Sequence, residues 1–534
     1  MSAQGPFEQL QPVPSRFAPA GMVCAVDHLA AGAGVDALRR GGTAADAAVA
    51  TSAVLAVTTQ HMCGLGGDLW AVVHPGPGQE VVALNASGRA GSGADPDRLR
   101  AEGHLTMPAS DHPAAVTVPG CADGWLALHA RFGRLPLAEV LAAARRYAFE
   151  GFPASPGLAA AFDRVADLTE AEDYRIPGGL CPGSIVRRSG VGRALDAIAT
   201  GDRAAFYRGE LGEGFLAVTA GEHTAEDLDR PQADWVAAVG AGAWGHRIWT
   251  APPNSQGYLT AAAAWIAGGL DLPDPHDPGW AHLLIEASRQ AAHDRLLVLH
   301  DSADAGELLS PARLAPRRAA IDPRRAGALG VPTGAGDTIA LCAVDGDRMG
   351  VSLIQSNASG WGSRLIAPGS RIFLHNRGQG FSLEPGHPAE YRPGRRPPHT
   401  LCPTLVTRPD GSLRAVLGTM GADAQPQILL QLLARLLAAG EDPGEAVAAG
   451  RFTLGAAGPS GGFDTWRAGG RVQVHLEGNA PEAWAAGLRD RGHDVVVGDA
   501  WSGEWGHAHL IDAGLTTLAG GSDPRATAGA VEGW

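Results

Sequence analysis

The order of apolar and polar positions predicts both buried helices and short strands. Thr43 is a suitable N-cap for a very apolar helix that runs to Val57, and residues 426–438 form a second strongly apolar helical run. Shorter apolar runs, such as residues 69–73, are bounded by glycine or aspartate and predict strands. Sheets flanked by long helices place the chain in the α+β class.

The pattern changes along the chain. Residues 120–270 are typical of helices with glycine and proline breaks. Residues 302–336 show little apolar periodicity, and we expect a long mobile loop there, of the kind that can carry a processing site. Beyond this stretch, two hairpins are predicted, 338–344 with 349–355 and 404–407 with 413–417.

Composition excludes several classes of function. All 42 basic residues are arginine, so the chain lacks the lysine that a pyridoxal enzyme or a P-loop requires. A net charge of -14 without a basic stripe argues against nucleic acid as a partner. The six cysteines are scattered without a C-x-x-C pair, and the H-E-x-x-H pattern is absent. We therefore expect no metal site and no organic cofactor.

The chain also carries no sign of export or membrane insertion. Its first thirty residues lack a basic segment followed by an apolar core, and no run of about 18 apolar residues occurs. We expect a cytoplasmic enzyme without a membrane partner.

Thr338 follows a glycine-rich stretch and begins a predicted strand. A threonine hydroxyl is a weak nucleophile that needs an adjacent base. If the chain is cut after Asp337, the α-amine of Thr338 becomes that base, since its reference pKa is about 8. The chain can make this cut itself, because the hydroxyl can attack the carbonyl of Asp337 and water can resolve the ester. The backbone N–H groups of Gly421 and Ala422, at a helix entrance, are suited to stabilise the oxyanion.

Other interpretations of the same residues stay open. An isolated Gly-Asp-Thr is also an ordinary turn with a capping residue. The chain could be an uncleaved, inactive relative that serves as a binding or scaffold protein, which failure to mature would support. It could also be a conventional metal-dependent amidohydrolase, which loss of activity on chelation would support.

Several ordered motifs accompany Thr338. They are Gly21–Val23, Asp46–Ala50, Leu65–Gly67, Pro252–Gly257, Val344–Asp345, Leu374–Asn376, Pro403–Val406 and Ser522–Arg525. In this order they resemble the gamma-glutamyltransferase family along nearly the whole chain, and Thr338 falls on the nucleophile of that family.

The resemblance implies a fold and a maturation. The fold is the four-layer αββα sandwich of N-terminal-nucleophile hydrolases. Autocatalytic cleavage would yield a large subunit, residues 1–337, and a small one, residues 338–534. The two fragments would stay together as a heterodimer that acts on a small-molecule substrate.

The resemblance also implies candidates for substrate binding. They are Arg89, Ser356, Asn357, Arg377, His399 and Thr400. Arg377 stands where the family has an amide, and Gly380 where it has an acid, so the local charge is reversed. An arginine favours an anionic acyl group over a cationic amine.

The pattern is similar to the subgroup that includes oxamate amidohydrolases. We therefore expect cleavage of an amide or acyl bond in a small carboxylate-bearing substrate. Two alternatives remain: a genuine gamma-glutamyl transferase or glutathione hydrolase, and a natural-product enzyme that removes an oxalyl group by carbon–carbon hydrolysis.

Overall fold

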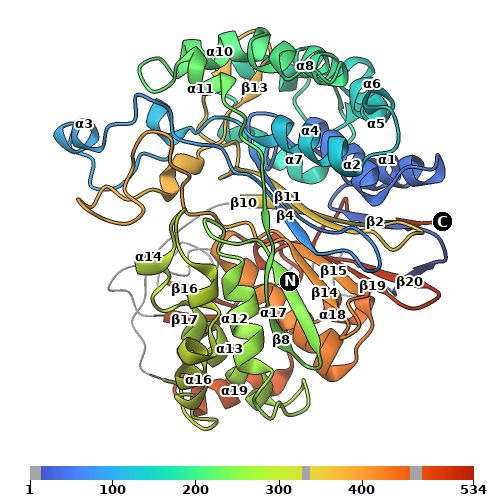
Figure 1. The fold of residues 1–534 in the computed structure, drawn as a ribbon, viewed down its shortest axis with the longest axis vertical. Coiled ribbons are helices and arrows are strands. Elements are labelled where there is room, and N and C mark those ends of the chain that lie inside the picture. Colours follow the sequence, from blue (N-terminus) through green and yellow to red (C-terminus); the bar gives the residue numbers. More distant parts are fainter. Residues whose placement is uncertain (1–13, 328–336, 457–471) are drawn as a thin grey trace, which may run out of the picture.

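The structure, a computed structural model, describes residues 14–327, 337–456 and 472–534. These residues form two seven-stranded sheets stacked face to face, with helices on both outer faces (Figure 1). All neighbouring strands within the two sheets are antiparallel. This is the αββα sandwich that the resemblance implies, and the fold prediction is confirmed.

The two large sheets combine strands from distant parts of the chain. The first sheet has the order β21 (Ala530–Gly533), β2 (Met22–Ala25), β10 (Asp337–Val344), β11 (Gly350–Ala358), β3 (Asp68–His74), β4 (Val82–Ala86), β7 (Asp234–Ala237). The second has the order β1 (Arg16–Ala18), β20 (Leu518–Ser522), β19 (Ala508–Ala513), β15 (Leu413–Thr419), β14 (Thr404–Thr407), β9 (His246–Thr250), β8 (Val239–Ala243). Smaller sheets join β16 (Phe452–Ala456), β17 (Val472–Leu476) and β18 (Val495–Val497), β5 (Phe152–Pro153) and β6 (Ile185–Val186), and β12 (Ile366–Ala367) and β13 (Ile372–Phe373).

One helical layer covers each sheet. The layer on the first sheet, at the top of Figure 1, includes α1 (His28–Arg39), α2 (Ala44–Thr58), α4 (Cys121–Phe132), α5 (Leu137–Val140), α6 (Ala142–Glu150), α7 (Pro156–Ala161) and α8 (Ser189–Ala199). The layer on the second includes α12 (Tyr258–Ala267), α13 (Pro278–Ala292), α16 (Pro311–Ala319), α17 (Gln425–Ala434), α18 (Pro443–Ala448) and α19 (Glu482–Asp490). Shorter helices are α3 (Pro96–Ala101), α9 (Arg203–Tyr207), α10 (Glu210–Val218), α11 (Ala225–Asp229), α14 (Arg295–Val298) and α15 (Ala305–Leu308).

Helix α2 lies against the centre of the first sheet. Thr43 caps it as predicted, because its hydroxyl accepts the N–H of Asp46 while the Asp46 carboxylate accepts the N–H of Thr43. All fifteen residues of the helix are buried between β10, β11 and the outer helices. An apolar run without a polar face suits this sandwiched position.

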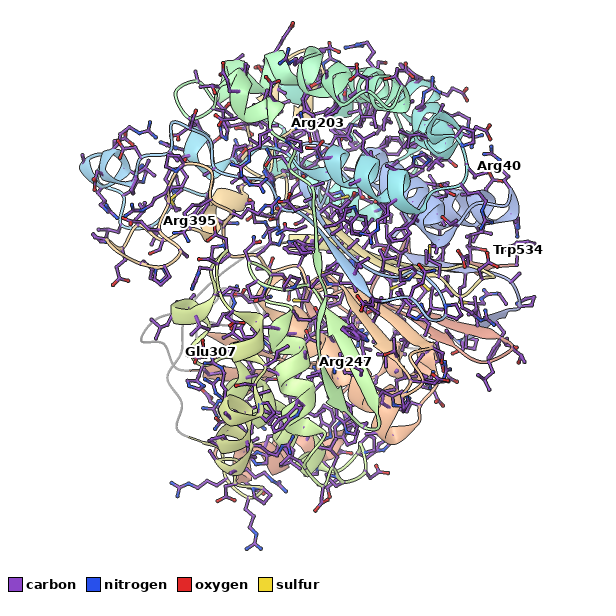
Figure 2. All side chains as sticks on the ribbon, viewed as in Figure 1. Arg40, Arg203, Arg247, Glu307, Arg395 and Trp534 are labelled. Atoms are coloured by element: carbon purple, nitrogen blue, oxygen red, sulfur yellow. The ribbon has the colours of Figure 1, made fainter. Side chains whose placement is uncertain are left out.

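The space between the sheets is filled by every second residue of their strands. Ala340 and Cys342 of β10 and Trp70 of β3 pack there against Leu405 and Val416 of the second sheet. Because side chains alternate across a strand, Thr338 faces this same space. Side chains fill all the layers, and Trp534, labelled in Figure 2, lies at one edge, where its carbonyl accepts the N–H of Ala20.

The predicted loop at residues 302–336 was wrong for the part that the structure describes. Helices α15 and α16 occupy this stretch up to Ala319, and residues 328–336 lie outside the described residues. Ser310 caps α16 and Pro311 stands at its first position, while Leu314 is the buried anchor. Such a helix has too few apolar residues to show a period. The strands β7, β8 and β9 likewise interrupt the helical stretch predicted for residues 120–270.

Within the described ranges, each helix is too short or too polar to cross a bilayer.

Candidate active site

Thr338 is the second residue of β10, an inner strand of the first sheet that lies between β2 and β11. Its side chain is fully buried, and its Oγ1 lies 3.1 Å from Oγ of Ser356 on β11. The pairing of β10 with β11 slips between Asp337 and Ile339, so the strand is irregular at this residue. Ser356 is in turn held by the N–H of Ala358, which donates to its Oγ at 2.8 Å. The structure thus joins two of the predicted site residues, Thr338 and Ser356.

Asp68 on β3 lies next to Ser356, so Thr338, Ser356 and Asp68 form a row of side chains across three neighbouring strands. Asp68 lies opposite Ser356 in the pairing of β3 with β11, so both side chains point to the same face of the sheet. Its Oδ2 accepts hydrogen bonds from Nε of Arg377 and from Nε2 of His399, both at 2.8 Å, and Nδ1 of His375 lies 3.4 Å away. All four side chains are buried. Asp68 therefore links two predicted substrate-binding residues to the row that contains Thr338.

The charges in this group are set by burial and by the ion pair. Burial alone would raise the pKa of Asp68, but the Arg377 guanidinium and the His399 ring hold it well below its ordinary value. Burial, helped by Arg377, lowers the pKa of His399 to about 4. His399 is therefore neutral at pH 7. Its Nε2–H donates to Asp68, and its Nδ1 accepts the N–H of Leu401 at 3.3 Å.

Arg377 has one partner for its charge and one donor group left over. Its Nε is bonded to Asp68, and its Nη1 donates to Oγ1 of Thr400 at 3.1 Å. In the described part of the chain its buried Nη2 has no hydrogen-bond partner. From the sequence we expect Arg377 to reverse the local charge of the pocket. The structure corrects this, because Asp68 neutralises it and leaves only the Nη2 donors available.

Gly421 and Ala422 form the turn that leads into α17. A Cβ on Gly418 would lie 2.8 Å from that of Ala340, so the end of β15 passes over the start of β10 and leads towards Thr338. Both turn residues have positive φ, 132° for Gly421 and 47° for Ala422. Among the described residues no acceptor contacts their N–H groups. This is the helix entrance at which oxyanion donors were predicted.

Two buried contacts hold this turn. Nε2 of Gln256 donates to the carbonyl of Ala422 at 2.9 Å and to that of Thr400 at 3.1 Å. Arg295 of α14 forms a buried ion pair with Asp423 at 3.1 Å. The amide of Gln256 thus connects the Gly421–Ala422 turn to Thr400, the residue that Arg377 contacts.

The structure does not bring Arg89 and Asn357 into this group. Nη2 of Arg89 donates to Asp234 at 2.5 Å, and Arg396 donates to the same carboxylate. Asn357 follows Ser356 and points to the opposite face of the sheet, where its Nδ2 donates to the carbonyl of Gln60 at 2.9 Å. Both side chains contact structural partners.

Asp68 and His375 were not predicted as site residues. Asp68 had one detectable signal, a carboxylate that directly follows Gly66-Gly67 at the start of an apolar strand. Its partners lie about 300 positions further along the chain, with sequence separations of 309 to Arg377 and 331 to His399. No local pattern connects residues so far apart.

One buried cluster of potential metal ligands lies away from this site. His282 and Glu286 of α13 meet His493, and Nδ1 of His282 lies 2.8 Å from Nε2 of His493. Glu286 is already bound by Arg289 and by the N–H of Gly327, which explains its burial without an ion. The cluster shares no residue with the row of Thr338, Ser356 and Asp68.

The sequence matches the family described as gamma-glutamyltranspeptidase over residues 30–533. The chain belongs to the gamma-glutamyltranspeptidase family. This confirms the resemblance of the motifs, and it makes the chain an N-terminal-nucleophile hydrolase or transferase.

Individual relatives match over almost the whole chain. The oxamate amidohydrolase proenzyme of Klebsiella pneumoniae subsp. pneumoniae is 34% identical, with 96% of this chain and 98% of that protein covered. The glutathione hydrolase-like YwrD proenzyme of Bacillus subtilis is 33% identical with the same coverage of both chains. The crystal structure of cephalosporin acylase from Bacillus halodurans superposes with a TM-score of 0.89 at 33% identity, over 100% of this chain and 99% of that one.

Proposed function

We propose that this protein is a self-cleaving amide hydrolase whose nucleophile is the hydroxyl of Thr338. The observation that carries the proposal is the position of Thr338 at the start of the inner strand β10, 3.1 Å from the Ser356 hydroxyl, in a family of N-terminal-nucleophile enzymes. Three relatives support the same activity, because each is named a proenzyme: one is glutathione hydrolase-like, one is an oxamate amidohydrolase and one is an acylase. Cleavage after Asp337 would leave residues 1–337 and 338–534 as a heterodimer.

The reaction follows from the groups around Thr338. The α-amine takes the proton of the hydroxyl as Oγ1 attacks the substrate carbonyl carbon. The N–H groups of Gly421 and Ala422 stabilise the oxyanion. The C–N bond then breaks, the amine leaves with the proton that the α-amine returns, and an ester on Thr338 remains. Water attacks this ester and gives a proton to the α-amine. The bond between the acyl carbon and Oγ1 then breaks, the α-amine returns the proton to Oγ1, and the acid leaves.

The decisive experiment is intact mass spectrometry of purified protein, combined with sequencing of the smaller fragment. We expect two non-covalently associated fragments instead of one 54.8 kDa chain, and a small fragment that begins Thr338-Ile339-Ala340. A full-length chain with full activity would overturn the mechanism.

We infer that the acyl group carries a carboxylate that pairs with Nη2 of Arg377. The similarity to an oxamate amidohydrolase favours an anionic acyl group of this kind. The unpartnered Nη2 offers the donors for it. A gamma-glutamyl substrate and carbon–carbon hydrolysis of an oxalyl group remain the alternatives, and a panel of gamma-glutamyl and oxalyl compounds separates all three.

Arg377→Gln should reduce use of an anionic substrate relative to a gamma-glutamyl one. Loss of a charged hydrogen bond costs about 1–3 kcal/mol, so kcat/KM for oxamate should fall about 5-fold to 150-fold more than kcat/KM for gamma-glutamyl-p-nitroanilide. The ratio within one variant cancels any general loss from the broken Asp68 pair. Arg247→Gln, at an exposed arginine of β9, is the matched control and should leave the ratio unchanged. A wild-type preference for gamma-glutamyl compounds would contradict the inference.

Activity should survive chelation, because the α-amine of Thr338 supplies the base. We expect unchanged kcat after dialysis against EDTA and no gain on addition of zinc. Activity that disappears with EDTA and returns with zinc would support a metal-dependent amidohydrolase instead.

A further inference from the structure

A cavity of ≈ 740 Å³ lies beside the Asp68–Arg377 pair. Arg377 and Thr400 belong to its lining, and most of the remaining wall is apolar. The large apolar side chains on it are Leu105, Met107, Leu296, Leu299, Phe381 and Leu383. This volume lies in the range of about 300–1,000 Å³ that is typical of small-molecule pockets, and it is far more space than a two-carbon acyl group needs.

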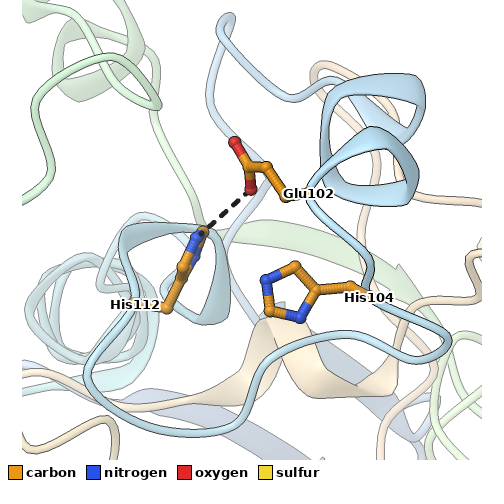
Figure 3. A group of neighbouring side chains, drawn as sticks. All are labelled: Glu102, His104 and His112. Carbon is orange, nitrogen blue, oxygen red and sulfur yellow. Dashed lines mark ion pairs between the residues drawn. The ribbon is translucent and has the colours of Figure 1, made fainter.

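Three polar side chains, Glu102, His104 and His112, lie at the two ends of the loop that contains Leu105 and Met107. Glu102 lies 3.8 Å from Nε2 of His112, and the rings of His104 and His112 meet edge to face at 5.5 Å (Figure 3). Nδ1 of His112 accepts the N–H of Ala114 at 3.1 Å.

The hydrogen bond from Ala114 determines which ring nitrogen of His112 carries the proton. Burial lowers the pKa of His112, so the ring is neutral at pH 7 and, with Nδ1 as acceptor, carries its proton on Nε2, towards Glu102. Glu102 and His112 thus lie close together at the two ends of the loop that contains Leu105 and Met107, beside the cavity.

Exposed apolar surface accompanies the cavity. Leu105 keeps 93% of its surface exposed, and Leu297, which follows Leu296 on α14, keeps 70%. Large apolar side chains left in water beside a concave site are typical of a surface that binds an apolar group.

The cavity adjoins the proposed carboxylate site. Arg377 belongs to the row that leads through Asp68 and Ser356 to Thr338. If the acyl carboxylate pairs with Nη2 of Arg377, any extension of the acyl group near this carboxylate enters the cavity. The amine leaves in the first step and lies on the other side of the scissile carbon.

We propose that the acyl half of the substrate carries an apolar body, of the size of an aromatic ring or a branched alkyl chain, which occupies this cavity. The substrate is then an amide of a substituted dicarboxylic acid and is larger than oxamate. This inference rests on the proposed function and names the substrate class of the same site.

Two series of p-nitroanilides and simple amides test it on the mature protein. In the first, the amine is constant and the acyl group is malonyl or benzylmalonyl. We expect kcat/KM to be about tenfold or more higher for benzylmalonyl, within the range that apolar pocket contacts supply. In the second series the malonyl group is constant and the amine changes from ammonia to benzylamine, which should leave kcat/KM nearly unchanged.

A variant that fills the cavity from its rim completes the test. Ala109 is exposed and lines the cavity, so Ala109→Trp should lower kcat/KM for benzylmalonyl about tenfold and spare malonyl. Ala101→Trp, at the exposed end of the neighbouring α3, is the matched control and should change neither value.

The outcomes separate the two proposals. Equal rates for malonyl and benzylmalonyl, or a benefit that follows the amine series, would overturn the assignment of the cavity and leave the hydrolase intact. Mature protein that cleaves none of these amides, nor oxamate or gamma-glutamyl compounds, would overturn the proposed function itself.

Discussion

Thr338→Ala should remain a single chain of 534 residues and should show no hydrolysis of any amide. Alanine removes the only atom of residue 338 that can attack the Asp337 carbonyl, and later the substrate. Without the cut, no α-amine is released to act as the base, so both roles are lost together. Intact mass and a discontinuous amide assay measure the two effects separately.

Thr338→Ser is the informative companion variant. It keeps the hydroxyl and the future α-amine, and it removes only a methyl group from a buried position. We expect a cleaved, active enzyme with a lower rate. A Thr338→Ala chain that is still cut at the same bond would show that another group starts the maturation.

Asp68→Asn should be the most destabilising single change at the site. The ion pair with Arg377 is buried on both sides, at 0% and 3% side-chain exposure. Removing one partner of such a pair leaves an uncompensated charge and costs about 3–5 kcal/mol. We expect a large fall in the urea midpoint, and about a hundredfold lower kcat/KM because Arg377 and His399 lose their common anchor.

The pH dependence follows from the sign of the shift. The pKa of Asp68 is lowered in the folded protein, so its contribution is fully present above the ordinary value of 3.8. It is lost as the pH falls from there through the folded pKa. The difference in stability between wild type and Asp68→Asn should therefore be constant near neutrality and shrink in acid.

A double variant and a surface control sharpen this prediction. Asp68→Asn combined with Arg377→Gln removes both charges, so it should be more stable than Asp68→Asn alone. Asp163→Asn, at an exposed carboxylate, should have no measurable effect. Equal stability of the single and double variants would show that Asp68 does not compensate Arg377.

Secondary structure was predicted correctly from the sequence where the signals lie close together in the chain. Helix α2 and the hairpin of β10 with β11 were predicted because their cap, apolar residues and turn lie within a few positions of one another. Thr338 was singled out as a strand start after a glycine-rich stretch, and the accompanying family motifs favoured it over an ordinary turn. Its hydroxyl contact with Ser356 needs only the short turn of one hairpin.

Prediction was poorer where a contact joins distant segments. Arg377 was named as a candidate, but Asp68, its ion-pair partner on β3, lies 309 positions away in the sequence, so the pairing of its charge was missed. Arg89 was assigned to the substrate from the family resemblance, whereas the structure pairs it with Asp234 of β7. The family resemblance supplied the layers of the fold, which no single segment of the sequence encodes.

The order of strands determines whether the two fragments of the mature protein could dissociate. On the first sheet, β2 of the larger fragment would lie between β21 and β10 of the smaller one, and β11 is followed by β3 of the larger fragment. The second sheet alternates in the same way, with β1 and β9 of the larger fragment on either side of the block from β20 to β14. The two proposed fragments would therefore be interwoven, and neither could be withdrawn without breaking both sheets. Exchange between molecules would require unfolding, and the two fragments should therefore share one melting transition and one lifetime.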